Sequence, residues 1–228
     1  MSRIIFDIET VGKDFDSLDK RTQEYLLRWA ETEEDIKDVR ESLSFYPLTG
    51  EIITIGMLNP DTDKGAVYFQ SPEATIAPFE ENGIRFESTS GAGAEKEILE
   101  KFWNTVKSYK QIITFNGRSF DCPFILIRSA VHRIKPSKDL MPNRYGDSHI
   151  DLLEQLTFYG ASRRRFSLDM WCKTFGIKSP KEEGITGYDI KDLFRNKRYV
   201  DIARYCFGDI KATKELLFNW EKYIRFNP

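Results

Sequence analysis

The sequence predicts an α/β fold built on a mixed sheet of five strands with helices on its faces. Apolar and alternating segments indicate strands at 4–10, 51–58, 66–69, 111–115 and 148–153. Short turns follow the second and third of these, so the first three strands are expected to form an antiparallel meander. The fourth strand is apolar throughout, as strands inside a parallel sheet are, and it follows a helical segment at 94–109. The last two strands are therefore expected to be parallel.

Composition limits the class of protein. The 228 residues are 40% hydrophobic and 14% aromatic, which is enough for one domain with a substantial core. A formal net charge of −2 argues against coating nucleic acid through bulk charge, but it leaves room for a local basic groove. The three cysteines, Cys122, Cys172 and Cys206, are far apart and form no C-x-x-C pair, which favours buried, reduced thiols. With neither a signal peptide nor a membrane-spanning run apparent, a cytoplasmic protein without a membrane partner is expected.

The first strand carries two acids on one face. Side chains alternate along a strand, so Asp7 and Glu9 point the same way. Two adjacent carboxylates repel each other in an ordinary core, and a divalent cation would remove that cost. The alternative is the frayed start of an edge strand with two solvated acids. The pair by itself does not decide between these interpretations.

A charged segment separates the first two strands. Residues 16–43 have helical spacing and predict one or two helices, in which Tyr25, Leu26 and Trp29 could share a face. These helices could form a flap over a site or cover one edge of the sheet, and the second interpretation is favoured. Residues 71–93 are expected to be a loop with a short strand near 84–86.

Another acid lies just after the fourth strand. The run Asn116 to Asp121 (NGRSFD) follows it, and Pro123 suits the first turn of a helix that should end near His132. Asp121 is therefore expected beside a helix N-terminus, where the dipole favours an anion. Taken alone, this acid is more simply interpreted as an N-cap.

The C-terminal third is expected to be helical. Helices are predicted at 167–176, 188–195 and 199–223, with a polar loop at 178–188. On the last helix Tyr205 and Asp209 are four residues apart and share a face. An acid on the apolar side of a helix needs a partner or a metal.

Three motifs together resemble a known superfamily. They are FDIET at Phe6–Thr10, NGRSFD at Asn116–Asp121 and YCFGD at Tyr205–Asp209, in that order. This set resembles the DEDD superfamily of 3′–5′ exonucleases, which implies a ribonuclease-H-like fold over residues 4–213, apart from an insertion at about 13–47. The position five residues before the last acid is Arg204, whereas Tyr205 matches the tyrosine (DEDDy) subgroup. The segments SHIDL at 148–152 and SLD at 167–169 look most like exonuclease domains of family-B DNA polymerases.

The resemblance implies a site and its cofactors. Two divalent cations, Mg²⁺ or Mn²⁺, would be held by Asp7, Glu9, Asp121 and Asp209, with Asp7 bridging both ions. Glu9 and Asp209 would hold the ion that carries the attacking water, and Asp121 the second ion. Tyr205 would orient that water.

Substrate contacts are less sharply indicated. The resemblance implies that the terminal nucleotides meet Thr10, Asn116 and Phe120. The run Arg163, Arg164 and Arg165 could grip phosphates, with a solvated charge run as an equally weighted alternative.

A few further residues are expected to be structural. Asp151 could lie behind the site, but a polar strand-end residue is favoured, and neither His132 nor His149 is expected to be catalytic. The tryptophans expected in the core are Trp29, Trp103, Trp171 and Trp220.

The predicted function is a metal-dependent 3′–5′ exonuclease, formed by residues 1–228 as a single domain. It would release nucleoside monophosphates from single-stranded 3′ ends by a two-metal-ion mechanism, with DNA favoured over RNA and a role in DNA repair. The alternative is a catalytically silent nucleic-acid-binding or assembly subunit on the same fold. A degenerate relative should have lost an acid, and all four are present.

Overall fold

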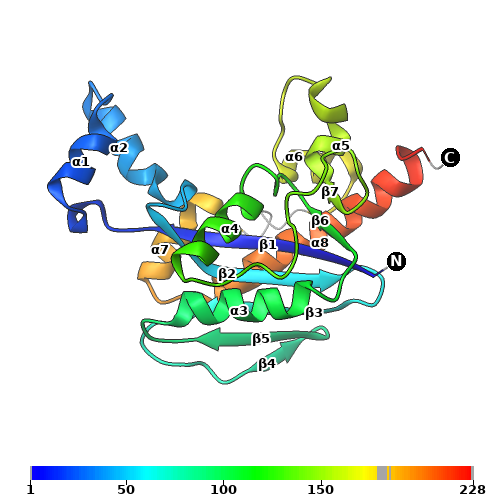
Figure 1. The fold of residues 1–228 in the computed structure, drawn as a ribbon. Coiled ribbons are helices and arrows are strands. Elements are labelled where there is room, and N and C mark those ends of the chain that lie inside the picture. The colour runs from blue at the N-terminus through cyan, green and yellow to red at the C-terminus, as the bar shows by residue number, and fades with distance from the viewer. Residues whose placement is uncertain (1, 179–183, 185, 227–228) are drawn as a thin grey trace.

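A computed structural model describes residues 2–178, 184 and 186–226, and its centre is one mixed sheet of seven strands (Figure 1). The strands lie in the order β4-β5-β3-β2-β1-β6-β7. Their bounds are β1 Arg3–Gly12, β2 Gly50–Asn59, β3 Lys64–Gln70, β4 Phe79–Glu81, β5 Ile84–Thr89, β6 Gln111–Thr114 and β7 His149–Asp151. The first three strands are antiparallel, and β6 and β7 run parallel to β1.

The α/β class and the mixed sheet are confirmed, but the expected count of five strands is wrong. Strand β5 pairs parallel with β3, and the three-residue strand β4 pairs antiparallel with β5. The short strand expected near 84–86 is the first half of β5. A three-residue strand is too short to show a period in the sequence, so β4 was not recognisable there.

Helices cover both faces of the sheet (Figure 1). On one face lie α3 (Ala94–Val106) and α4 (Asp121–Val131). The other face carries the long helix α8 (Tyr199–Tyr223), with α5 (Leu152–Leu156) and α6 (Leu168–Phe175) packed beside it and α7 (Ile190–Arg195) at its start. None of the helices in the described part of the chain is long and apolar enough to cross a membrane.

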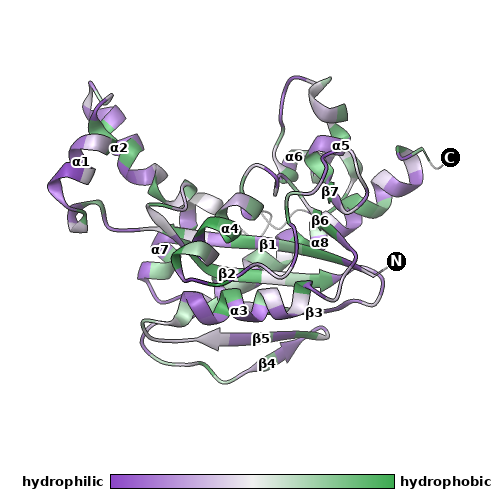
Figure 2. Cartoon of the chain, in the orientation of Figure 1, coloured by the Kyte–Doolittle hydropathy of each residue, from purple (hydrophilic) through white to green (hydrophobic). Residues whose placement is uncertain are grey.

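Alternation along β1 divides its side chains between the two faces. Ile4, Phe6 and Ile8 belong to the core cluster with α3 and α4, whereas Ile5 belongs to the cluster with α8. Figure 2 shows the central strands among the most hydrophobic parts of the ribbon. Because side chains alternate, the odd-numbered acids of β1 point toward the α8 face.

The middle of the inserted segment, residues 13–47, forms an arm that stands away from the sheet (Figure 1), whereas Phe15 and Leu43 near its ends are buried. It contains α1 (Lys20–Leu27) and α2 (Glu33–Glu41), and none of these seventeen residues, all of which the structure describes, is buried. Trp29 is 81% exposed. The expectation that this segment covers a sheet edge, with Trp29 in the core, is therefore wrong. The sheet ends at β4 and β7, and the amphipathic face of the arm is only half-buried.

Other expectations fared better. Trp103 and Trp220 are buried, Trp171 packs against the core, and all three cysteines are free and buried. The strand expected at 148–153 ends at Asp151, because Asp151 Oδ1 accepts from the Leu153 N–H and caps α5. The polar loop expected at 178–188 lies largely outside the described residues.

A buried ion cluster joins α3, α4 and β2. Glu95 is only 5% exposed, and its carboxylate accepts from Arg128 Nε at 2.8 Å and Nη2 at 2.6 Å. It also accepts from the Ile52 N–H at 2.9 Å and lies 2.6 Å from His132 Nε2. Burial alone would raise the pKa of Glu95, but these hydrogen bonds, that of Arg128 first, lower it. His132 is thus structural, as expected.

Replacing Arg128 should destabilise the fold strongly. Arg128→Met leaves the buried Glu95 carboxylate without its cation, a change that typically costs about 3–5 kcal/mol. Urea unfolding should show the loss as a lower midpoint. The control is Lys96→Met, which breaks an exposed pair with Glu100 and should change the free energy of unfolding by less than about 0.5 kcal/mol. Equal effects of the two variants would contradict the assignment.

Candidate active site

The site lies where β1 outruns its neighbour β6. Strand β6 pairs only with Arg3–Ile5, so the β6-facing edge of β1 is open beyond Ile5 in the described structure. Asp121, at the start of α4, reaches this edge, and its Oδ1 accepts from the Ile8 N–H at 3.1 Å. A backbone donor that would otherwise lack a ladder partner is satisfied in this way. This hydrogen bond holds the Asp121 carboxylate at the backbone of Ile8, the residue between Asp7 and Glu9.

Helix α8 completes the group from the other side. Cys206 Sγ lies 3.6 Å from the Asp7 carbonyl oxygen and 3.7 Å from Asp7 Oδ2. The close approach depends on Gly56, which is opposite Asp7 in the β1–β2 register. A Cβ at Gly56 would lie 2.4 Å from Ile210 Cδ1 of α8. Tyr205 and Asp209 flank this contact on α8, and a hydrogen bond joins their side chains.

The four acids repel one another. Burial, followed by Asp121, Glu9 and Asp209, raises the pKa of Asp7 well above its ordinary value. Burial, followed by Asp209 and Asp121, does the same to the pKa of Glu9. Burial raises the pKa of Asp121 to about 7, although its backbone hydrogen bonds oppose the shift. A divalent cation bound among these carboxylates would relieve the repulsion.

The donor set fits a hard divalent cation. Ligand atoms of Asp7, Glu9 and Cys206 lie within 4.8 Å of one another. Carboxylate oxygens are the donors that Mg²⁺ and Mn²⁺ prefer. Burial raises the pKa of the Cys206 thiol well above its ordinary value, so it stays protonated and is a poor ligand. Of the predicted ligands, Asp7 and Glu9 have donor atoms within this distance, and the Ile8 N–H holds the Asp121 carboxylate at the neighbouring backbone.

Asp151 has a larger role than expected. It is 1% exposed, and its carboxylate accepts from the Asn116 N–H and the Arg118 N–H, each at 2.9 Å. These bonds fix the loop that leads into Asp121. Asp151 is the last residue of β7, as favoured from the sequence, and caps α5, and its bonds to the loop before Asp121 are an additional contact. His149, as expected, is structural: burial, aided by Arg118, lowers its pKa to about 3.

The predicted substrate contacts are only partly assembled. The Thr10 hydroxyl donates to the Ser44 carbonyl at the base of the arm, at 2.8 Å. Arg165 Nη2 donates to Asn116 Oδ1 at 3.0 Å, which brings one arginine of the run to the loop before Asp121. The Arg164 guanidinium lies instead over the ring of Phe166, 5.0 Å from its centroid.

The remaining predicted contact, Phe120, is partly buried and packs against Phe124 with ring centroids 5.5 Å apart. Sequence patterns gave no signal for Ser44, Gly56 or the loop-fixing bonds of Asp151, because each acts through a contact between distant segments.

Comparison with solved structures supports the class of fold. The chain resembles the family B DNA polymerase from the hyperthermophilic archaeon Pyrobaculum calidifontis, with a TM-score of 0.59 and 16% sequence identity. The match covers 97% of this chain and 24% of that chain. The mixed sheet with flanking helices is thus the ribonuclease-H-like exonuclease fold of such polymerases.

Sequence comparison shows the family. Residues 74–225 match the model of predicted 3′–5′ exonucleases related to the exonuclease domain of PolB. The chain belongs to this family. The matched range contains Asp121, Tyr205 and Asp209, whereas Asp7 and Glu9 lie before it and join them only in the fold.

Curated relatives are archaeal polymerases. The chain is 25% identical to DNA polymerase 1 of Sulfolobus acidocaldarius over 147 residues, which are 58% of this chain and 16% of that protein. It is 29% identical to a DNA polymerase of Methanocaldococcus jannaschii over 136 residues, or 54% of this chain and 8% of that protein. The match therefore spans less than a fifth of these relatives.

Cation binding should be visible as a change in melting temperature. Mn²⁺ at about 100 times its dissociation constant would add roughly 2.7 kcal/mol to the folded state. At roughly 2–4 °C per kcal/mol, the melting temperature should rise by several degrees. In metal-free protein, Asp7→Asn relieves repulsion and should melt at the same temperature or higher, while the rise with Mn²⁺ should shrink.

The difference in melting temperature between the metal-free parent and Asp7→Asn should depend on pH. A carboxyl whose pKa is raised on folding destabilises the fold as pH rises from its unfolded to its folded pKa. The advantage of metal-free Asp7→Asn over the parent should therefore grow as pH rises above about 4, the ordinary pKa of an aspartate, because the pKa of Asp7 is raised in the folded state. Asp38→Asn, which removes an exposed carboxylate on α2, is the matched control. A lower metal-free melting point with an intact Mn²⁺ response would make Asp7 a structural residue.

Proposed function

We propose that this chain is a metal-dependent 3′–5′ exonuclease that removes nucleoside monophosphates from single-stranded 3′ ends. The observation that carries the proposal is the convergence of Asp7 and Glu9 with Asp121, held at the Ile8 N–H, and with helix α8, which carries Tyr205 and Asp209. The family match supports the exonuclease class, and the names of the relatives favour DNA over RNA. Residues 1–228 would form one exonuclease domain with a helical insertion at about 13–47, acting in DNA repair in the cytoplasm.

The acids would hold two divalent cations, with Asp7 shared between them. Such ions supply a nucleophilic water and neutralise charge on the phosphate and on the leaving oxygen. Glu9 and Asp209 would serve the ion nearest Tyr205, and Asp121 the other. The Ile8 N–H and the loop fixed by Asp151 keep the Asp121 carboxylate in place while substrate enters.

Tyr205 acts as a hydrogen-bond donor. Burial, followed by the charges of Asp209 and Glu9, raises the pKa of its phenol above the ordinary value. The hydroxyl therefore keeps its proton at neutral pH and cannot serve as a general base. Its single O–H donates to the Asp209 carboxylate, and its oxygen would accept from the attacking water and so orient it.

Removal of any acid should abolish hydrolysis. Asp7→Ala, Glu9→Ala, Asp121→Ala and Asp209→Ala are each expected to lose activity on end-labelled single-stranded DNA with Mg²⁺ or Mn²⁺. Tyr205→Phe should be milder, with a loss within the roughly 10²–10⁴-fold range of a water-positioning group. Glu100→Ala, an exposed acid on α3, is the control. Parallel assays on RNA and duplex define the substrate.

Two results would overturn the proposal. Full activity in Asp7→Ala would remove the central ligand from the mechanism, and undiminished activity in EDTA would remove the metals. No hydrolysis by the parent chain under any of these conditions would favour the alternative, a catalytically silent nucleic-acid-binding subunit.

The arginine run should contribute to the salt dependence of binding. In a catalytically inactive Asp7→Asn protein, replacing Arg163, Arg164 and Arg165 with Gln should flatten the slope of log affinity against log salt. The slope should change by about 0.7 for each phosphate that the variant no longer neutralises. Replacing the exposed arm cations Lys20, Arg21 and Arg28 changes the net charge equally and should leave the slope unaltered. Identical slopes for the two triple variants would return Arg163–Arg165 to a solvated charge run.

A further inference from the structure

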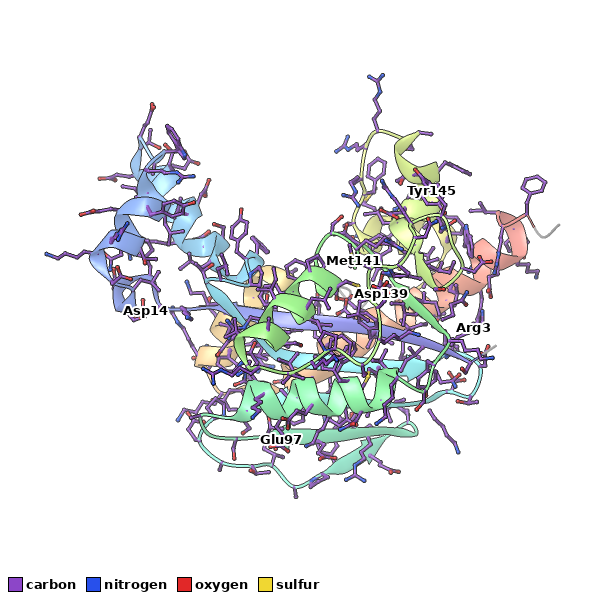
Figure 3. The ribbon with its side chains drawn as sticks, in the orientation of Figure 1. Arg3, Asp14, Glu97, Asp139, Met141 and Tyr145 are labelled. Carbon is purple, nitrogen blue, oxygen red and sulfur yellow. The ribbon has the colours of Figure 1, made fainter. Side chains whose placement is uncertain are left out.

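Positive charge is concentrated in two neighbouring segments. Residues 133–146 and 157–166 together hold seven lysines and arginines against a single acid, Asp139, in a chain whose formal net charge is −2. Contacts between Arg144 and Tyr159, and between Tyr145 and Tyr159, bring the two segments side by side. Figure 3 shows Tyr145 at the upper right, on the side of the molecule opposite the arm. Local charge of this kind attracts a polyanion even when the whole protein is acidic.

Exposed aromatic rings lie within this basic surface. Tyr145 is 72% exposed and Phe158 is 63% exposed. Tyr145 is held against Tyr159, with ring centroids 4.9 Å apart, and the Tyr159 hydroxyl accepts from Gln155 Nε2 at 2.7 Å. A hollow of about 390 Å³ opens between these rings and the C-terminal end of α8. Its lining combines the aromatic rings of Tyr145, Phe158 and Trp220 with the ion pair of Arg225 and Asp147.

The backbone that presents these rings is strained. Phe158 and Tyr159 have φ of 49° and 55°, in the left-handed region, and Gly160 follows with φ of 98°. Bulky side chains rarely adopt this conformation, which costs on the order of 1–3 kcal/mol per residue. The strain at Phe158 and Tyr159 is not offset by core packing, because the Phe158 ring is exposed to solvent. Strain of this kind points to a binding role for the rings.

A chain of contacts connects this surface to the candidate active site. Arg118, on the loop before Asp121, lies 3.7 Å from Glu154, measured from Nε to Oε2. Glu154 Oε1 accepts from Arg144 Nη2 at 2.9 Å, and the Arg144 guanidinium lies 5.9 Å from the centroid of the Tyr159 ring. Arg165 joins the same loop through Asn116. The link through Arg118 and Glu154 is buried, whereas the bond of Arg165 to Asn116 is exposed and brings residues 157–166 to the loop before Asp121.

We propose that Tyr145 and Phe158 are stacking positions for unpaired bases on the 5′ side of the scissile bond, with Arg163 and Arg164 beside the phosphates. This inference rests on the proposed exonuclease function and deepens it. Bases inside a duplex keep their faces hidden, whereas a single strand can stack on protein rings whatever its sequence. The substrate class is therefore a single-stranded 3′ end long enough to reach from the acids to these rings.

The test measures binding as a function of strand length. Anisotropy of 5′-labelled oligothymidylates of about 3 and about 12 nucleotides is followed in the inactive Asp7→Asn protein, which leaves the strand intact. Phe158→Asn and Tyr145→Ser each remove one ring, and asparagine tolerates the left-handed backbone at 158. Each should weaken binding of the long strand by roughly 5- to 150-fold. The short strand should bind as before, and the salt slope should not change.

Matched controls and contrary outcomes are available. Tyr25→Ser and Trp29→Ser remove exposed rings from the arm and should leave binding of both strands unaltered. Unchanged affinity for the long strand in folded Phe158→Asn and Tyr145→Ser would overturn the proposal. Equal weakening of both strands would also overturn it, since the rings would then belong to the terminal-nucleotide site. The exonuclease function is tested separately: if it is wrong, the parent chain will not hydrolyse the strand.

Discussion

The mutual repulsion of four carboxylates is the constraint on which this structure depends. Asp7, Glu9, Asp121 and Asp209 come from one strand and two helices, and nothing in their own charges would keep them together. The surrounding fold keeps them together instead. Strand β6 ends at the level of Ile5, which leaves room for Asp121, and Gly56 in β2 allows α8 to pack closely. Such a site is prepared for a cation because the cost of assembling its ligands is met by the fold.

The two faces of the sheet have different roles: one stabilises the fold, and the other carries acids of the candidate site. On the face of α3 and α4, the buried Glu95–Arg128 pair and a continuous apolar cluster stabilise the fold. On the face of α8, Cys206 of the apolar cluster contacts Asp7, and burial raises the pKa of both Asp7 and Glu9. The strict alternation of β1 separates these roles within a single strand, because each successive side chain belongs to the opposite face.

What could be predicted from the sequence follows from local period and spacing. Alternation in β1 placed Asp7 and Glu9 on one face, and helical spacing placed Tyr205 beside Asp209. A position of Asp151 behind the site was only the less favoured alternative, because its bonds reach a loop some 33–35 residues away and leave no local pattern. The arm was misjudged because amphipathic spacing shows that a face could be buried, not that a partner exists. In the α1 and α2 helices that face is only half-buried, at Leu26, Ile36 and Val39.

The exposed arm has a consequence for local stability. Helices of eight and nine residues are marginal in water by themselves, and α1 and α2 bury no side chain to compensate. Their support is largely local, including the Asp19 cap and the capping box of Thr32 and Asp35. Amide hydrogens of the arm should therefore exchange through local opening, at a free energy well below that of global unfolding. Its sequence can change, or a protease can cut it, while the sheet and its acids remain intact.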